Sequence, residues 1–433
     1  MQIKSLEDSK QLEELVQIAS LYDAEGYLSA KPKKNLPTGL QQTMAHPHVL
    51  HITRNLPPLV GGMERLNWHM AEELAKYATV TVIGPAGAAQ YKPESVDISE
   101  VPLKPLPLFL TLAFARGLWL AFRERPEVIL AGSGLTAPIA WLLSKLCGAR
   151  SAVYLHGFDI TASNTVYRKL WRPTFKLLDH VIVNSTPTKE LAVAAGVSKN
   201  NLSLVHPGAD LPESPQSAER IASFREKHGL QNKKILLSVG RLTTRKGLRE
   251  FVEHALPQIV DQEPDSVLVV IGEAPKDALG AGIQSVESIQ EQARKSNVGE
   301  HLKFLGVITD RTLLATAYEA AHVHVFPVRH IPEDPEGFGM VAIEAAAHGL
   351  PTVAFKTGGV IDAVSHGESG YLVKTENYTD LSKNTISAIR KPIERSSIVR
   401  FSMKFSWNQF GKSISKALIS SMKNPKKKKS TKN

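Results

Sequence analysis

The sequence predicts an α/β fold with two doubly wound domains, each built on a parallel β-sheet. The chain has 433 residues, more than one hydrophobic core ordinarily holds, so two domains of roughly 150–200 residues are expected. From His48 onward, short β-branched runs alternate with longer helical ones, which is typical of a parallel sheet with helices on both faces. This alternation breaks in the proline-rich stretch 207–215 and restarts at Lys234.

The first half of the chain carries six expected strands separated by helical segments. The strands are 48–52, 79–83, 128–131, 152–155, 180–183 and 202–205. The helices are 63–77, 108–123, 137–146, 166–178 and 188–195. Because each strand is followed by a helix, the strands are expected to run parallel, with their carboxyl ends at one edge of the sheet.

The second half repeats the pattern and sets the expected domain limits. Its strands are 234–239, 266–271, 302–304, 323–326 and 352–354. We expect an N-terminal extension with an amphipathic helix at residues 1–46, followed by two doubly wound domains at 47–212 and 213–400. A closing helix is expected at 401–422 and a basic disordered tail at 423–433. Two such domains on one linker would face each other across a cleft.

Composition and charge narrow the class of protein. A hydrophobic share of 42% and a charged share of 22% are typical of a soluble globular protein. The single cysteine, Cys147, excludes an internal disulfide framework and agrees with a reducing compartment. The first residues are polar and form no secretory signal, and no apolar run long enough to span a bilayer is free of charge. A cytoplasmic location, with the protein peripheral at the inner face of the membrane, is therefore expected.

The net charge of +10 is partly concentrated in the tail, which ends Lys426-Lys427-Lys428-Lys429-Ser430-Thr431-Lys432. Basic residues near an anionic bilayer attract it by roughly 1 kcal/mol each, so this tail is a candidate for contact with a membrane surface. A solvated tail is the alternative. The chain shows no helix-turn-helix, zinc-finger spacing or RNA-reading motif, so nucleic acid is not expected as a partner.

Two loops after predicted strands carry features suited to an anionic ligand. Gly61-Gly62 opens a helix after the first strand, where glycine lets backbone amides approach a ligand and a helix N-terminus favours an anion. A simple strand-to-helix turn would use the same residues. Arg241 and Lys246 lie after the first strand of the second half, where a guanidinium fork and an ammonium could both face a diphosphate.

A third loop combines glycines with two glutamates. Glu336-Gly337-Phe338-Gly339-Met340 follows a strand, and Glu344 lies one turn into the helix that begins at Met340. The glycines expose backbone amides, and carboxylates accept hydrogen bonds from paired hydroxyls such as those of ribose or a sugar ring. Together these features favour a sugar-nucleotide site.

With these motifs in order, the chain resembles the family 4 glycosyltransferases of the GT-B fold, from about His48 to Leu418. Gly61-Gly62 resembles the family's acceptor-side loop that touches the donor diphosphate, and Gly240-Arg241-Leu242 with Lys246-Gly247 resembles its phosphate-binding pair. Glu336 to Glu344 resembles the E-x7-E signature, and Thr357-Gly358-Gly359 the loop after it. Phe405-Ser406-Trp407 resembles the start of a helix that returns to the N-terminal domain.

The resemblance implies roles for these residues. Residues 47–212 would form the acceptor domain and 213–400 the donor domain. Arg241 and Lys246 would hold the diphosphate and neutralise the leaving group. Glu344 would bind the ribose hydroxyls, while Glu336 and the amides of Phe338 and Gly339 would hold the transferred sugar.

The same resemblance extends to the first domain and to the cofactor. His156, after strand 152–155, would reach the transferred sugar as a catalytic residue, and Asp159 is an acceptor-side candidate. The family uses no metal, and the chain has no Asp-x-Asp triplet near a strand end to ligate one. Two cations can neutralise the charge on a departing diphosphate as a metal ion would, so no cofactor is expected beyond the nucleotide-sugar substrate.

The function implied is metal-independent, retaining transfer of a hexose, with mannose as one candidate, from a GDP- or UDP-sugar to a lipid-linked or glycan acceptor. Cell-surface polysaccharide or lipopolysaccharide biosynthesis is the expected setting. The apolar stretch 108–122, with Arg116 and Arg123, could lie at a membrane interface or could be an ordinary core helix. The alternatives are a GT-B-fold epimerase or phosphorylase and a non-catalytic protein that binds nucleotide sugars.

Overall fold

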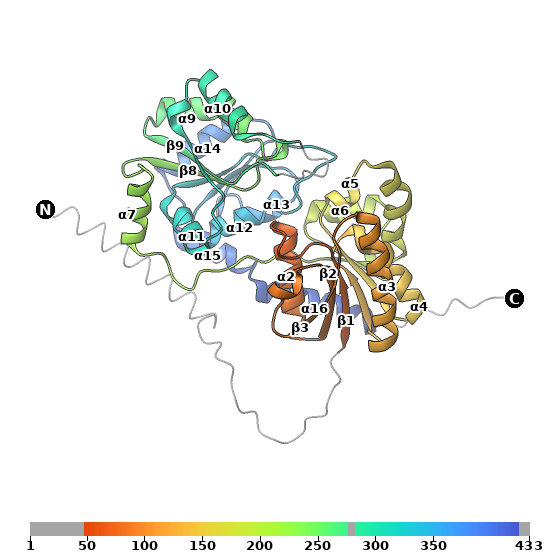
Figure 1. Ribbon diagram of the computed structural model, residues 1–433. Coiled ribbons are helices and arrows are strands. Elements are labelled where there is room, and N and C mark those ends of the chain that lie inside the picture. The colour runs from red at the N-terminus through yellow and green to blue at the C-terminus, as the bar shows by residue number, and fades with distance from the viewer. Residues whose placement is uncertain (1–46, 276–281, 424–433) are drawn as a thin grey trace. The chain divides into compact units, whose positions relative to one another are not determined.

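The computed structural model describes residues 47–275 and 282–423, except for the side chains of 420–423. They divide into an N-terminal unit (residues 47–208 and 407–423) and a C-terminal unit (Ala209–Ser406), drawn in Figure 1. The units therefore change at 208/209 and 406/407, close to the sequence-based limits of 212 and 400. The expected helix of the N-terminal extension and the basic tail from residue 424 on lie outside the described residues.

The N-terminal unit has a seven-stranded parallel sheet in the order β3-β2-β1-β4-β5-β6-β7. Its strands are β1 (His48–Ile52), β2 (Thr79–Pro85), β3 (Val96–Val101), β4 (Val128–Ala131), β5 (Arg150–Leu155), β6 (His180–Val183) and β7 (Leu202–Leu204). Its α-helices are α2 (Gly62–Leu74), α3 (Leu106–Glu124), α4 (Ala137–Cys147), α5 (Phe158–Thr161), α6 (Thr186–Ala194) and α16 (Trp407–Lys423).

Helices cover both faces of this sheet. On one face α3 and α4 contribute Phe109, Ala113, Ala140 and Leu143 to a core shared with alternate strand residues such as Leu50. On the other face α16 packs against α2, where the Trp407 ring stacks on His69 at 3.9 Å. The closing helix therefore belongs to the N-terminal unit although the C-terminal unit precedes it in the chain.

The C-terminal unit has a six-stranded parallel sheet in the order β10-β9-β8-β11-β12-β13. The strands are β8 (Lys234–Val239), β9 (Ser266–Ile271), β10 (Leu302–Gly306), β11 (Val323–Phe326), β12 (Thr352–Phe355) and β13 (Gly370–Val373). The helices are α7 (Ala218–Lys227), α8 (Leu248–His254), α9 (Leu256–Gln262), α10 (Val286–Lys295), α11 (Arg311–Ala320), α12 (Met340–Ala347), α13 (Val360–Ala363), α14 (Tyr378–Arg390) and α15 (Arg395–Met403). Side chains of Ser217, Ser285 and Asp310 cap α7, α10 and α11.

The fold class is confirmed, with three local differences from the expected elements. The segment 166–178 is not an α-helix but a π-helical turn (Tyr167–Trp171) followed by a 3-10 helix (Arg172–Leu177), because Pro173 cannot donate to a helical ladder. Strands β3 and β13 were not expected. Each pairs on one side only, at an edge of its sheet, and β3 carries the polar residues Asp97, Ser99 and Glu100.

Candidate active site

The predicted motifs of the C-terminal unit meet at its topological switch point. The loop with Arg241 and Lys246 follows β8, and the loop with Glu336 follows β11. Strands β8 and β11 are neighbours in the sheet although β9 and β10 lie between them in the chain. In open parallel sheets this point is where the loops of two neighbouring strands diverge and leave room for a ligand. The chain topology therefore brings two sequence motifs some ninety residues apart to one place.

Lys246 and Glu336 form the central contact of this site. The Lys246 ammonium donates to Glu336 Oε2 at 2.9 Å and lies 4.6 Å from the centre of the Phe326 ring. Arg245 Nε lies 3.2 Å from the same carboxylate oxygen, and the Arg245 guanidinium also pairs with Asp334. The Glu336 side chain is only 11% exposed, so this carboxylate is buried between two cations.

Burial and charge act in opposite directions on this pair. Burial raises the pKa of Glu336, but Lys246, Arg245 and Arg241 outweigh it and lower the pKa to about 2. Burial lowers the pKa of Lys246, and the attraction of Glu336 only partly opposes that effect. Glu336 is therefore firmly ionised, whereas the ammonium is held in its charged form mainly by its carboxylate partner.

Arg241 and Glu344 lie at the edges of the cluster. Arg241 is exposed, and its charge acts on both Lys246 and Glu336. Glu344, on α12, is half-buried and accepts a hydrogen bond from the Tyr318 hydroxyl at 3.2 Å. Tyr318 is 2% exposed, so it fixes one oxygen of Glu344 from the protein interior.

The glycines of the third motif bring backbone close to backbone. Gly339 has φ +95° and precedes α12 without offering a side-chain cap, which leaves amide N–H groups at the start of the helix for an anion. Met340 is the first residue of α12, and Phe338 is buried against Phe405 at 5.6 Å between ring centres. The Gly359 amide donates to the Glu336 carbonyl at 2.8 Å, and a Cβ at Gly359 would collide with the carbonyl of Gly337.

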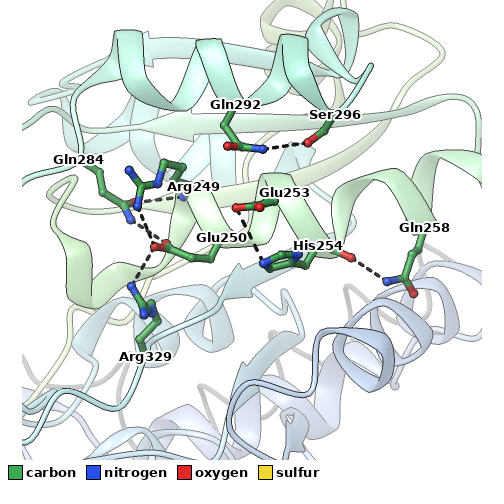
Figure 2. Close-up of polar contacts among 9 residues, drawn as sticks. All are labelled: Arg249, Glu250, Glu253, His254, Gln258, Gln284, Gln292, Ser296 and Arg329. Atoms are coloured by element: carbon green, nitrogen blue, oxygen red, sulfur yellow. Dashed lines mark hydrogen bonds and ion pairs between the residues drawn. The ribbon is translucent and has the colours of Figure 1, made fainter.

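Glu250, in the first turn of α8, connects the segments on either side of the loop that carries Arg241 and Lys246 (Figure 2). Its Oε1 lies 2.8 Å from Arg329 Nη1, and its Oε2 accepts from Gln284 Nε2 at 2.7 Å. The Arg329 amide donates to the Arg245 carbonyl at 2.8 Å, and the Gln284 amide donates to the Leu242 carbonyl at 3.2 Å. Glu250 thus binds the side chains of Arg329 and Gln284, whose backbone amides bond the loop that carries Lys246.

In the N-terminal unit, Gly61 and Gly62 lie where predicted, at the start of α2. The helix begins at Gly62 and has no side-chain cap, so its first amides face outward from the helix end. Glu64 in the first turn accepts from Asn55 Nδ2 at 2.7 Å, which fixes the preceding loop. A Cβ at Gly61 would meet the Glu64 carboxylate.

His156 follows β5 and is 8% exposed. Its Nε2 lies 2.9 Å from the Gly132 carbonyl, which can only accept, so Nε2 carries the proton and Nδ1 remains for a ligand. Asp159 is equally buried and accepts from the His156 amide at 2.9 Å. Burial raises the pKa of Asp159, although His156 and backbone amides lower it. Asp159 therefore shapes the turn that carries His156, and its contact with an acceptor stays a prediction.

The sequence missed four residues of the C-terminal cluster: Arg245, Asp334, Tyr318 and Glu250. Arg245 directly precedes Lys246 in the chain, but nothing in the sequence distinguishes a cation that pairs with Glu336 from a solvated one. Tyr318 and Glu250 lie on helices whose burial is visible only in the fold.

Two doubly wound units, with a cation pair and two glutamates at one switch point, are the arrangement expected of a GT-B glycosyltransferase. Two family models match the chain in order: Glycosyltransferase Family 4 over residues 60–213 and Glycosyl transferases group 1 over residues 220–404. The chain belongs to this family of glycosyltransferases, as the motifs predicted.

Similar proteins agree with this assignment. The chain is 28% identical over 334 residues to the GDP-mannose-dependent alpha-(1-6)-phosphatidylinositol monomannoside mannosyltransferase of Mycolicibacterium smegmatis, covering 75% of this chain and 85% of that protein. It is 33% identical over 201 residues to D-inositol 3-phosphate glycosyltransferase 2 of Catenulispora acidiphila, covering 45% of this chain and 44% of that protein. The second match thus spans less than half of that relative's length.

Solved structures share the fold. A crystal structure of Anabaena Alr3699/HepE in complex with UDP and glucose has a TM-score of 0.71 at 20% identity, covering 87% of this chain and all of that one. A glycosyltransferase from Rickettsia africae has a TM-score of 0.72 at 16% identity, covering 87% of this chain and 99% of that one.

Proposed function

We propose that this glycosyltransferase moves a hexose, with mannose from GDP-mannose as the first candidate, onto a lipid-linked acceptor, with retention of configuration and without a metal ion. The observation that carries the proposal is the buried Lys246–Glu336 pair with Arg245 and Arg241 around it. The mannosyltransferase relative supports the donor and the acceptor class.

The cations suit the departing nucleotide diphosphate. Lys246 has three N–H donors and uses one on Glu336, so the others remain for phosphate oxygens. Arg241, exposed beside it, can supply a guanidinium fork to a second phosphate. Cations already held by the fold stabilise charge in the transition state without a reorganisation cost, which is the role a metal would otherwise have.

The carboxylates suit the hydroxyl groups of the donor. Glu336 stays ionised far below neutral pH and can accept from hydroxyls of the transferred sugar, while Glu344 keeps acceptor capacity for ribose beyond its bond from Tyr318. His156 Nδ1, in the N-terminal unit, is the candidate contact to the transferred sugar.

In the proposed step the bond between the anomeric carbon and the diphosphate oxygen breaks. The acceptor hydroxyl oxygen forms its bond to the same face of that carbon, and its proton passes to the departing diphosphate oxygen. No side chain becomes covalently attached. Arg241 and Lys246 take up the charge that develops on the diphosphate, and Glu336 supplies the negative charge that favours an oxocarbenium-like sugar.

The test is transfer by the purified protein from GDP-mannose, UDP-glucose and an ADP-sugar to phosphatidylinositol mannoside, in buffer with EDTA. We expect GDP-mannose to serve as donor and the product linkage to keep the α configuration by NMR. An inverted linkage would refute retention. Activity lost in EDTA and restored by Mg²⁺ would refute metal independence, and exclusive use of UDP-sugars would refute the donor.

Variants locate the activity at the proposed site. Lys246→Ala is expected to lower kcat/KM at least ~100-fold, the usual loss for a group that stabilises developing charge. Glu344→Ala is expected to raise the donor KM with kcat nearly unchanged. Lys295→Ala is the control, because Lys295 is 65% exposed and pairs only with Glu291 on its own helix. Full activity of Lys246→Ala would contradict the assignment.

A further inference from the structure

Exposed large apolar side chains are distributed very unevenly over the described residues. Fourteen are exposed, and all but Ile283 and Val307 belong to the N-terminal unit. Nine of them lie in one layer of that unit, formed by α3, α4 and the segment 162–178, and we call this the apolar layer. Its exposed members are Leu106, Leu108, Trp119, Phe122, Leu142, Leu146, Val166, Leu170 and Leu177.

The apolar layer is one continuous surface. Helices α3 and α4 pack side by side on the same face of the sheet, and the 3-10 helix Arg172–Leu177 packs against α4 (Figure 1). Gly117 makes the close approach possible, since a Cβ there would press on the Leu143 side chain. Phe122 and Leu146, from different helices, line the same open depression of about 630 Å³.

The layer is also strongly basic. Together α3, α4 and residues 162–178 contain one acidic side chain, Glu124, which pairs with His48. They contain seven cations, which are Arg116, Arg123, Lys145, Arg168, Lys169, Arg172 and Lys176. Arg116 and Arg123 lie 5.6 and 4.7 Å from the centre of the Trp119 ring. Two further arginines, Arg125 and Arg150, and one carboxylate, Glu127, line the depression beside Phe122, so its lining also carries a net positive charge. Exposed aromatic and aliphatic side chains among cations match the interface of an anionic bilayer.

By length and composition alone, α3 could cross a membrane. Its inner face excludes that, because Phe109, Ala113 and Leu120 are at most 4% exposed and pack in the core of the sheet. The helix is therefore held flat on the unit, with its outer face unpartnered among the described residues. A second copy of the chain would bring seven more cations against these seven, so an acidic surface is the better match.

We propose that the apolar layer docks on the surface of an anionic lipid bilayer. The phosphate head groups lie among the arginines and lysines, and Trp119, Phe122 and Leu146 enter the boundary between head groups and acyl chains. The proposal deepens the proposed function, since a lipid-linked acceptor would then be met at the bilayer. It is testable apart from that function, because vesicle binding is measured without donor or acceptor.

The experiment is co-sedimentation of the full chain with vesicles of phosphatidylcholine alone or mixed with phosphatidylglycerol, at low and high salt. We expect binding to the mixed vesicles that weakens with salt. Lys169→Glu with Lys176→Glu should weaken it roughly 30-fold or more, from ~1 kcal/mol per cation lost. Phe122→Glu with Leu146→Glu should weaken it at least about tenfold.

Matched controls come from the C-terminal unit. Val307→Glu changes an equally exposed apolar residue, and Lys227→Glu an exposed cation, and both should bind as the wild type does. Unchanged circular dichroism and donor hydrolysis establish that each variant is folded. Equal binding to neutral vesicles, equal loss in the controls or no loss in the layer variants would overturn the proposal. So would a dimer in sedimentation velocity that Phe122→Glu dissociates while vesicles are not bound.

Discussion

Neutralising Glu336 is the change whose size the structure fixes best. The carboxylate is 11% exposed and lies 2.9 Å from Lys246 Nζ and 3.2 Å from Arg245 Nε. Its pKa falls from 4.5 to about 2 despite burial. At 1.36 kcal/mol per pKa unit, the ionised form stabilises the fold by ~3 kcal/mol relative to a neutral isostere. Glu336→Gln therefore lowers the free energy of unfolding at pH 7 by up to this amount. The loss is smaller if Lys246, without its carboxylate partner, releases its proton and becomes neutral.

The pH dependence of this stabilisation follows from the same pKa values. Because the folded-state pKa lies below 4.5, the stabilisation is complete above that pH and is lost as pH falls towards 2. The difference between wild type and Glu336→Gln should therefore be ~2–3 kcal/mol at pH 7 and about half as large near pH 3. At neutral pH this corresponds to a fall of ~5–10 °C in the Tm of a unit of this size.

The chain provides an internal control for this measurement. All five tryptophans, Trp68, Trp119, Trp141, Trp171 and Trp407, belong to the N-terminal unit. In a urea titration, tryptophan fluorescence follows that unit, while far-UV circular dichroism follows both. We expect Glu336→Gln to shift the dichroism transition and to leave the fluorescence transition in place. Equal stability at pH 7, or a difference that grows on acidification, would refute the electrostatic account.

Two further predictions concern the loop that carries Lys246. Gly247→Ala should raise the donor KM at least about tenfold, because a Cβ at this positive-φ residue would collide with the Pro327 carbonyl. Gly306→Ala is the control, since Gly306 also has a positive φ (+68°) but its Cβ would meet no other atom. An equal effect of both variants would point to backbone strain alone. Glu250→Ala should raise the donor KM about five- to tenfold with little change in kcat, since it frees Arg329 and Gln284. Glu263→Ala is the control and should leave the donor KM unchanged, because it removes the pairing with the half-exposed Arg390. A fall in kcat alone for Glu250→Ala would contradict a positioning role.

Local patterns were sufficient for most of the fold. Strands such as β1 and β8 are short, largely apolar runs followed by helices, which is the pattern typical of strands buried in a parallel sheet. Edge strands lack that signal. β3 alternates polar residues along its length and pairs on one side only, so its sequence resembles a loop until β2 is beside it.

Residues of the candidate site could be predicted where the signal lies within one loop, and could not where it depends on a contact with a distant segment. Glycines and charges in a strand-to-helix loop mark Arg241, Lys246 and Glu336 without any structure. The choice between Arg245 as a solvated cation and Arg245 as a partner of Glu336 depends on a loop ninety residues away. For Asp159 the sequence predicted a contact with the acceptor but not the bond that the structure shows, in which its carboxylate accepts from the His156 amide within the turn. The contact with an acceptor stays a prediction.

The charges of the C-terminal cluster explain how the loop holds three cations close together in the empty protein. Arg241, Arg245 and Lys246 would repel one another if they stood alone, and burial already lowers the pKa of Lys246. Glu336 and Asp334 offset two of the three charges, leaving a net positive site rather than a neutral one. If this loop binds the donor as proposed, a diphosphate would meet cations that the fold already holds in place, and binding would not have to order the loop. Removal of Glu336 should therefore harm the empty protein first and the bound state only in consequence.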